Sequence, residues 1–288
     1  MAAGAKLGDA IRIVRDDAAG RILTFDSATF VPGHYGAASA SRDVVVAASY
    51  AGVLCARMIA RSKPRGAIGL DCAIGKDGAG VAGLWFYEAL DIPAAAADVM
   101  TAEMGNGRDL YDEGIVSRVN ELAEGLGLEP GMTVAEAAAL LLDQAAVSTV
   151  DRFADKERRE VIATNAHGRS IVCTDSIAFA REEDRGRNVL CTAGHTGRSV
   201  VGYITHAAPW GFICSDGGIG KNNSGITALE PAADAGIAGA SVDALTARMG
   251  DGHSTYFDGV ISAVNRLAAA KGVTVGMPAT EAARLLLS

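Results

Sequence analysis

The chain has 288 residues, of which 49% are hydrophobic and 21% charged, a balance that excludes an intrinsically disordered protein. Its net charge of −8 leaves no broad basic surface for a nucleic-acid backbone. The longest apolar stretch, residues 44–60, is interrupted by polar side chains and is shorter than the roughly 20 apolar residues of a membrane span. We therefore expect a globular protein that binds neither nucleic acid nor membrane.

The sequence contains an internal duplication. Residues 68–142 align without a gap with residues 213–287, an offset of 145, and 31 of the 75 aligned pairs are identical. A period of this length is too long for a solenoid repeat and corresponds to a whole domain. We predict two tandem, pseudo-symmetric α/β repeats, residues 1–145 and residues 146–288, each large enough to bury its own core.

Each half begins with a predicted β-hairpin. Residues that favour strands flank short turns rich in Asp, Asn and Gly, which is typical of antiparallel strand pairs. The two strands and the turn between them are residues 11–15, 21–25 and 16–20 in the first half, and 161–164, 170–174 and 165–168 in the second.

After each hairpin, short apolar strands alternate with helical patterns. This order predicts right-handed crossovers and a mostly parallel sheet with helices on both faces. The predicted strands are residues 43–48, 66–70 and 92–97, and residues 188–193, 211–214 and 237–242. The predicted helices are residues 53–61, 84–90, 114–127 and one from 134, and residues 199–207, 228–235, 259–272 and one from 279.

Polar residues follow each of the three predicted parallel strands in both halves. In an open α/β sheet, ligands bind at the carboxyl ends of the strands. These turns are Ser49 to Gly52, Asp71 to Lys76 and Asp98 to Gly107, with counterparts Gly194 to Gly197, Asp216 to Lys221 and Asp243 to Gly252. We expect the functional site at these edges, between the two halves.

The second of these turns carries an Asp and a Lys in both halves. Asp71 and Lys76 recur as Asp216 and Lys221, with a glycine before each lysine. Backbone N–H groups of such a loop, together with the lysine, favour an anionic ligand. The alternative is structural: the Asp caps the turn and the Lys pairs with it. The spacing does not match a nucleotide-binding Walker loop.

The same turn differs between the halves in a chemically informative way. Asp77 is replaced by Asn222, and Ala79 by Ser224, which places a serine near Lys221 in the second half only. A lysine can activate a neighbouring serine as a nucleophile, as in Ser–Lys hydrolases. The competing interpretation is that Ser224 caps the helix that follows.

The first turn also differs, because Tyr50 is replaced by His195. Histidine is well suited to proton transfer near neutral pH, so this substitution suggests one catalytic and one supporting half. Equally, His195 can close the turn by bonding to the backbone. Ser49 precedes Tyr50 but lacks the flanking glycines of a nucleophile elbow, which weakens a catalytic role for it.

The third turn supplies further candidates for ligand contacts. Asp98 and Asp243 end the predicted third strands, where they can hold a ligand or cap the loop. Arg108 in the first half is replaced by His253 in the second, beside the Gly-x-Gly segment. His206 and Trp210 precede the second-half Asp loop and have no counterparts in the first, a further sign of specialisation.

The cysteines and histidines indicate neither a metal site nor a disulfide framework. There are five cysteines, an odd number, and no cysteine of one half aligns with a cysteine of the other. No CxxC, HxxxH or HxH spacing occurs, so we expect no metal and no cofactor. The segment before Arg15 lacks the apolar core of a secretory signal peptide. A reducing cytoplasm is the simplest compartment.

Three functions remain open on the sequence alone. The first is an enzyme, a hydrolase of amide, lactam or ester bonds in a small polar or anionic metabolite, with His195, Lys221 and Asp216 at its centre. The second is an isomerase or lyase that transfers protons with a Lys, a His and an Asp. The third is a non-catalytic small-molecule-binding protein. In each case the partner is a small molecule, and assembly into a homo-oligomer stays open.

Overall fold

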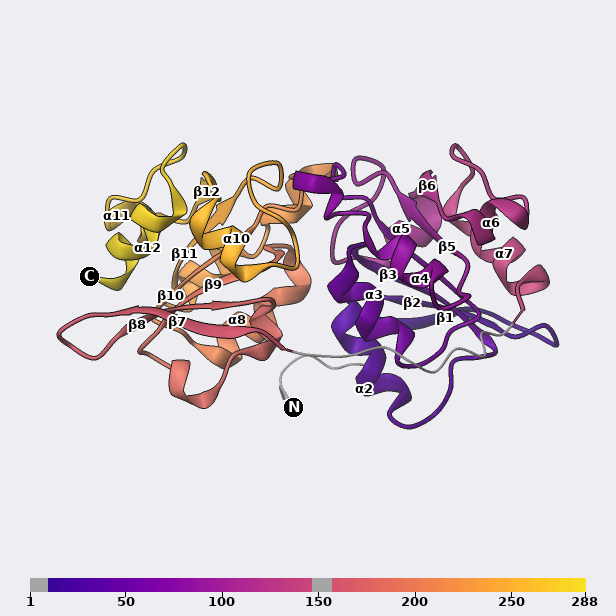
Figure 1. Ribbon diagram of the computed structural model, residues 1–288, viewed down its shortest axis with the longest axis horizontal. Coiled ribbons are helices and arrows are strands. Elements are labelled where there is room, and N and C mark those ends of the chain that lie inside the picture. The colour runs from indigo at the N-terminus through magenta and orange to yellow at the C-terminus, as the bar shows by residue number, and fades with distance from the viewer. Residues whose placement is uncertain (1–9, 147–156) are drawn as a thin grey trace.

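The computed structural model describes residues 10–146 and 157–288, and it contains two halves side by side (Figure 1). Each half holds a six-stranded sheet whose strands lie in sequence order. The first sheet contains β1 (Ile11–Asp16), β2 (Arg21–Phe25), β3 (Asp43–Tyr50), β4 (Gly66–Leu70), β5 (Ala94–Ala97) and β6 (Val116–Val119). The second contains β7 (Arg159–Thr164), β8 (Ser170–Thr174), β9 (Val189–His195), β10 (Gly211–Ser215), β11 (Ala238–Val242) and β12 (Ile261–Val264).

The two sheets have the same topology, which confirms the predicted pair of α/β repeats. In each sheet the four inner strands are parallel and both edge strands are antiparallel to their neighbours. The hairpins β1–β2 and β7–β8 confirm the predicted antiparallel start of each half. Residues 147–156, which follow the predicted start of the second domain at residue 146, lie outside the described residues.

The helices of the first half are α2 (Val31–Tyr35), α3 (Val53–Ala60), α4 (Gly83–Glu88), α5 (Gly107–Glu113), α6 (Glu121–Gly125) and α7 (Val134–Gln144). Those of the second are α8 (Val201–Ala207), α9 (Leu229–Asp234), α10 (Gly252–Phe257), α11 (Arg266–Ala270) and α12 (Ala279–Leu287). Within the described residues α2 has no counterpart, because the connection after β2 is longer: Ser27 and Ser176 are 149 residues apart, whereas Tyr50 and His195 are 145 apart.

Alternation along the strands explains why helices cover both faces of each sheet. In the second half, Ile171 and Cys173 of β8 join a cluster with residues of α10 and α12. Val172, between them, joins the opposite cluster with residues of α8 and α9. Successive side chains of a strand point to opposite faces, so an uninterrupted apolar strand supplies both cores. The first half repeats this arrangement with α3 and α4 packed together, and α5 against α7.

The prediction of one long helix over residues 114–127, and over 259–272, is wrong for the first part of each segment. The residues that follow Gly114 and Gly259 form the edge strands β6 and β12, and only the later residues form the short helices α6 and α11. The segments contain several β-branched residues, and each pairs with the open edge of β5 or β11. Tertiary strand pairing therefore overrides the helical spacing of the apolar residues.

A buried asparagine joins strand, loop and helix at the same point of both halves. Asn120 caps α6 by accepting from the Ala123 N–H at 3.0 Å, and its carboxamide also bonds three other backbone groups. Asn265 repeats all four contacts with Ala268, Gly239, Leu229 and Ile237. Both side chains are almost fully buried. These bonds use both the oxygen and the nitrogen of each carboxamide. A different side chain at either position would therefore leave some of the backbone groups without a partner.

We predict that Asn120→Ala and Asn265→Ala each lower the free energy of unfolding by at least about 3 kcal/mol, because several buried backbone groups lose their partners at about 1–3 kcal/mol each. Asn106→Ala, which removes a half-buried helix cap, should cost only about 1 kcal/mol. Urea denaturation of the three variants measures the difference. Equal, small losses for all three would contradict the assigned role.

Candidate functional site

The carboxyl ends of the parallel strands of one sheet face those of the other, and we call this contact region the junction. The backbone N–H of Lys76 donates to the carbonyl oxygen of Ala244 at 2.9 Å. The N–H of Lys221 donates to the carbonyl of Val99 at the same distance. Each residue of the second pair is 145 positions from its counterpart in the first. The junction therefore has pseudo-twofold symmetry, and the duplicated lysine loops lie at its centre.

The loops that meet at the junction have an unusual left-handed backbone. Cys72, Ala73 and Ile74 have φ angles of 47°, 56° and 67°. In the second half, glycine occupies the positions equivalent to Cys72 and Ala73, and Ile219 has a φ of 66°. A left-handed conformation costs roughly 1–2 kcal/mol for each residue with a side chain. The surrounding contacts must therefore stabilise the first loop more than the second.

Asp71 and Asp216 provide that stabilisation from the base of each loop. Asp71 Oδ1 accepts from the N–H groups of Ala73 at 3.2 Å and Val99 at 3.1 Å, and Oδ2 accepts from the Ser117 hydroxyl at 2.7 Å. Asp216 Oδ1 accepts from the equivalent N–H groups of residues 218 and 244. Burial raises the pKa of Asp216. Both carboxylates thus hold the loop against the neighbouring strand end, as the structural alternative expects for the Asp. That alternative also expected the lysines to pair with these two carboxylates, but they pair with Asp258 and Asp109 instead.

The two loops meet at Ala73 and Gly218. A Cβ atom on Gly218 would lie 2.9 Å from the Ala73 methyl and 3.1 Å from the carbonyl carbon of Cys72. The pseudo-equivalent positions therefore have room for one methyl group and not two.

We predict that Gly218→Ala destabilises the protein by about 1–3 kcal/mol, because the new methyl overlaps Ala73 and the φ of 80° at residue 218 disfavours a side chain. The double variant Ala73→Gly/Gly218→Ala should recover part of this loss, since it again leaves one methyl at the contact. Thermal or urea unfolding of the single and double variants gives the coupling energy. A coupling energy of zero would show that the loops do not meet here.

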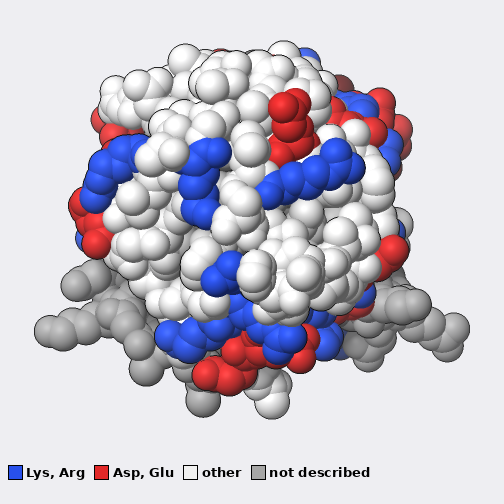
Figure 2. All heavy atoms as spheres, turned by 90° about the vertical axis from the view of Figure 1, so that its left-hand side faces the viewer, with Lys and Arg blue, Asp and Glu red and all other residues white. Residues whose placement is uncertain are grey.

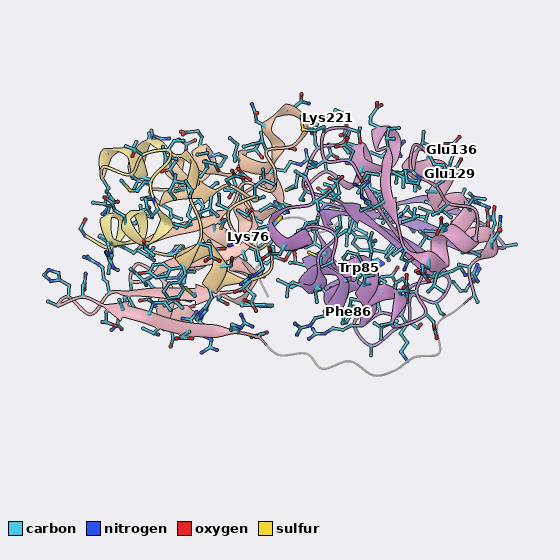
Figure 3. The ribbon with its side chains drawn as sticks, turned by 45° about the horizontal axis from the view of Figure 1, so that its top comes forward. Lys76, Trp85, Phe86, Glu129, Glu136 and Lys221 are labelled. Carbon is cyan, nitrogen blue, oxygen red and sulfur yellow. The ribbon has the colours of Figure 1, made fainter. Side chains whose placement is uncertain are left out.

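Lys76 and Lys221 reach across the junction and pair with carboxylates of the opposite half (Figure 3). Lys76 Nζ lies 2.9 Å from Asp258 Oδ2, and Lys221 Nζ lies 3.2 Å from both carboxylate oxygens of Asp109. Each lysine side chain is 28% exposed. An ammonium group has three N–H donors. Within the described part of the chain, each lysine therefore keeps at least one donor for an acceptor from solution.

A second pair of contacts occupies symmetry-related positions at the junction but is an ion pair on one side and an amide–carboxylate hydrogen bond on the other. Asp77 pairs with Arg248 at 3.1 Å. At the symmetry-related place Asn222 donates to Glu103 at 2.9 Å. The sequence differences at positions 77 and 222 are therefore coupled to those at positions 103 and 248. The two exposed borders of the junction, one with Asp77 and Arg248 and the other with Asn222 and Glu103, are called its rims. Sequence reasoning missed Glu103, Arg248, Asp109 and Asp258, although paired changes of charge at the 145-residue offset signal the first two.

Ser224 is buried, and its hydroxyl forms a structural hydrogen bond. Its Oγ accepts from the backbone N–H of Met104, across the junction, at 2.9 Å. Among the described residues, neither the Lys221 ammonium nor the His195 imidazole forms a hydrogen bond with this hydroxyl. The position equivalent to Ser224 is Ala79, so this tie exists on one side only. A nucleophilic Ser224 stays a prediction, and among the described residues no base is hydrogen-bonded to its hydroxyl.

His195 lies at the end of β9, buried beneath the junction. Its Nδ1 accepts from the Gly197 N–H at 2.9 Å, which assigns the proton of the neutral ring to Nε2. Burial lowers the pKa of His195 to about 4. In the neutral ring the acceptor nitrogen is engaged, which leaves no basic nitrogen at pH 7. The geometry favours the turn-closing interpretation over general-base catalysis.

We predict that His195 makes stability depend on pH. The unfolded chain binds the proton near pH 6.5 and the folded protein near pH 4, so the contribution is complete above pH 6.5 and is lost as pH falls towards 4. Between pH 7 and pH 5, wild type should lose about 2 kcal/mol relative to His195→Gln in urea unfolding. A difference that does not change with pH, or an imidazole NMR shift that titrates near pH 6.5, would exclude the lowered pKa.

Tyr50, which replaces histidine in the first half, is also buried, and its hydroxyl has no hydrogen-bond partner among the described residues. It lines a cavity of about 10 Å³ together with Ser49, Cys55 and Tyr87. That volume is about the size needed for one water molecule and is too small for a metabolite. Ser49 itself accepts from the Ala28 N–H at 3.0 Å, so its hydroxyl fixes the segment after β2.

The remaining candidates have local contacts. Asp98 accepts from the Met100 N–H, and Asp243 accepts from the Leu245 N–H, both at 2.8 Å, so each closes a turn. Arg108 pairs with Asp112 within α5. His253 Nε2 lies 2.9 Å from a carboxylate oxygen of Glu160, on β7. Within the described ranges, the side-chain hydrogen bonds and ion pairs of these four residues stay within their own half, so the structure does not bring them together with the lysines.

Comparison of the chain with protein-family models, with curated proteins and with solved structures finds no match. In residues 10–146 and 157–288, no three His, Cys, Asp or Glu side chains are grouped to hold a metal ion. None of the described helices combines the length and the apolar character needed to cross a membrane. All five cysteines are buried free thiols.

Proposed function

We propose that the protein binds a small anionic metabolite at the rims of the junction without converting it. The observation that supports this proposal most directly is the position and exposure of the Lys76 and Lys221 ammonium groups. Each ammonium is positioned by a carboxylate of the opposite half, is partly open to solvent and keeps at least one N–H donor. A carboxylate or phosphate group is the natural acceptor for such a point charge.

The same geometry favours binding over hydrolysis or proton transfer. A nucleophile needs a base within hydrogen-bond reach, and a proton-transfer site needs an acid or base with a free reactive atom. The Ser224 hydroxyl accepts from a backbone amide, and the acceptor nitrogen of His195 is occupied. Asp71 and Asp216 accept backbone N–H groups within their own loops. These reactive groups stabilise the junction, which supports the non-catalytic alternative.

The surroundings of each lysine restrict the ligand. Asp258 lies beside Lys76, and both Asp109 and Glu103 lie on the rim that carries Lys221. Fixed carboxylates repel a second large negative charge, so a ligand with one anionic group fits better than a polyanion. The ligand therefore belongs to the class of small monocarboxylates or monophosphates, with polar groups that can bond the neighbouring side chains.

We predict that a thermal-shift screen of small carboxylates and phosphates finds a ligand that raises the melting temperature, because binding stabilises the folded state. In calorimetry, Lys76→Gln or Lys221→Gln should weaken its affinity about tenfold, or 1.4 kcal/mol. Arg266→Gln is the matched control, since it also removes one positive charge but pairs with Glu230 and Asp234 away from the lysines. The affinity of the Arg266→Gln variant for the ligand should equal that of the wild-type protein.

Two results would contradict the proposal. The first is a ligand whose affinity is the same in both lysine variants and in the control, which would place its site elsewhere. The second is a covalent adduct of a serine-directed probe on Ser224 that disappears in Ser224→Ala. That adduct would restore the hydrolase hypothesis, because it requires an activated hydroxyl.

A further inference from the structure

A group of positive side chains lies at the end of the second half, far from the junction. Figure 2 shows this end, with Lys and Arg side chains across the middle of the face. Trp210 directly precedes β10, and Arg169 directly precedes β8. Lys271 follows α11 as its C-cap residue. We call these three residues the Trp210 cluster.

The two cations of the cluster share one aromatic ring. The Arg169 guanidinium carbon lies 3.6 Å from the centroid of the Trp210 ring, and Lys271 Nζ lies 5.3 Å from it. Burial, and secondarily the charge of Arg169, lowers the pKa of Lys271. Two like charges are therefore held close together in a half-buried place, which is unfavourable unless an anion joins them.

No carboxylate of the described residues neutralises this pair. Arg169 and Lys271 have no ion pair within 10–146 or 157–288. Other cations of the second half do have such partners: Arg266 pairs with two carboxylates, and so does Arg159. In a chain with a net charge of −8, an unneutralised pair of this kind is not a consequence of a general excess of basic residues.

The indole nitrogen of Trp210 gives an independent indication. Its Nε1 is buried and has no hydrogen-bond partner among the described residues. A buried indole N–H normally finds an acceptor, because leaving it unpaired costs about 1–3 kcal/mol. Because Nε1 has almost no exposed surface, an acceptor from a ligand reaches it only if the side chains around the ring move.

The first half lacks the cluster. The residues at the equivalent positions are Arg65 for Trp210, Leu126 for Lys271 and Gly20 for Arg169. Arg65 donates to the carbonyl oxygens of Ala19 and Leu142 and so ties the end of its own half together. In the second half, Asn165 Nδ2 donates to the equivalent carbonyl, that of Leu287, at 3.4 Å, and the position of Arg65 is taken by the aromatic ring with its two cations.

We propose that the Trp210 cluster is a binding site for a phosphate group, either free phosphate or the phosphate of a small monoester. Stacking on the indole fixes the plane of the Arg169 guanidinium and leaves the N–H donors along its edge available. Those donors match the oxygens of phosphate in a fork, and Lys271 adds a second charge. The net negative charge of the protein disfavours a nucleic-acid backbone as the source.

Tryptophan fluorescence tests the site directly. The chain contains two tryptophans, and Trp85 is 64% exposed on α4, so Trp85→Phe leaves Trp210 as the only reporter. Inorganic phosphate or glycerol phosphate, titrated at constant ionic strength against chloride, should change the Trp210 emission with saturation in the micromolar to millimolar range. Tighter binding of the monoester would identify a phosphorylated metabolite as the source, and tighter binding of inorganic phosphate the free ion.

In the Trp85→Phe background, Arg169→Gln and Lys271→Gln should each weaken phosphate binding about tenfold or more. Arg266→Gln, which removes a charge already paired with carboxylates of the same half, should leave it unchanged. Lys76→Gln and Lys221→Gln should also leave it unchanged, so failure of this site and failure of the junction proposal are distinguishable. Melting temperatures confirm that each variant is folded. Absence of saturation by about 10 mM phosphate, or equal weakening in the Arg266 variant, would overturn the proposal.

Discussion

The close approach of two left-handed loops at the pseudo-twofold axis determines the organisation of the rest of the molecule. The loops can meet only because Gly218 has no side chain opposite Ala73. Their backbone is unfavourable for Cys72, Ala73 and Ile74, by roughly 1–2 kcal/mol each. Buried carboxylates at the base of each loop and backbone bonds across the axis hold this conformation. Polar residues that a sequence pattern marks as reactive are therefore used to stabilise the junction.

This requirement explains why duplication preserved the Asp of the loop. In a symmetric interface the same surface serves both partners, so a residue that supports the contact is needed in both copies. Asp71 and Asp216 bond equivalent backbone groups, and both lysine N–H groups reach equivalent carbonyls. The contact alone thus accounts for retention of the Asp in both halves, whereas the backbone N–H bonds of residues 76 and 221 do not require a lysine side chain. The ammonium groups are the part of the motif that this contact leaves available.

The sequence predicted the repeat, the hairpins and the alternation of strands and helices, because these depend on local periodicity and turn residues. It failed at Val116–Val119, where β-branched residues also have helical spacing and only the open edge of β5 decides the outcome. It could place the lysines at a strand end but not identify Asp109 or Asp258, since a contact across two domains has no local signature. The Trp210 cluster combines three distant segments and was equally beyond reach, although the unmatched tryptophan was visible.

The position of the asymmetry within the fold follows from the same constraint. At the junction a change in one half can be matched by a change in the residue that it contacts across the junction, as Asp77 with Arg248 and Asn222 with Glu103 show. At the ends of the molecule away from the junction, the described residues of one half have no such partner in the other. The second half can therefore carry Trp210 where the first half has Arg65 without affecting the other sheet. A duplicated protein of this design can therefore acquire a one-sided binding site more readily at the amino ends of its strands than at the carboxyl ends where ligands of open α/β sheets usually bind. For this chain, the unpaired cations are found at that outer end, which makes it the better place to look for specialised recognition.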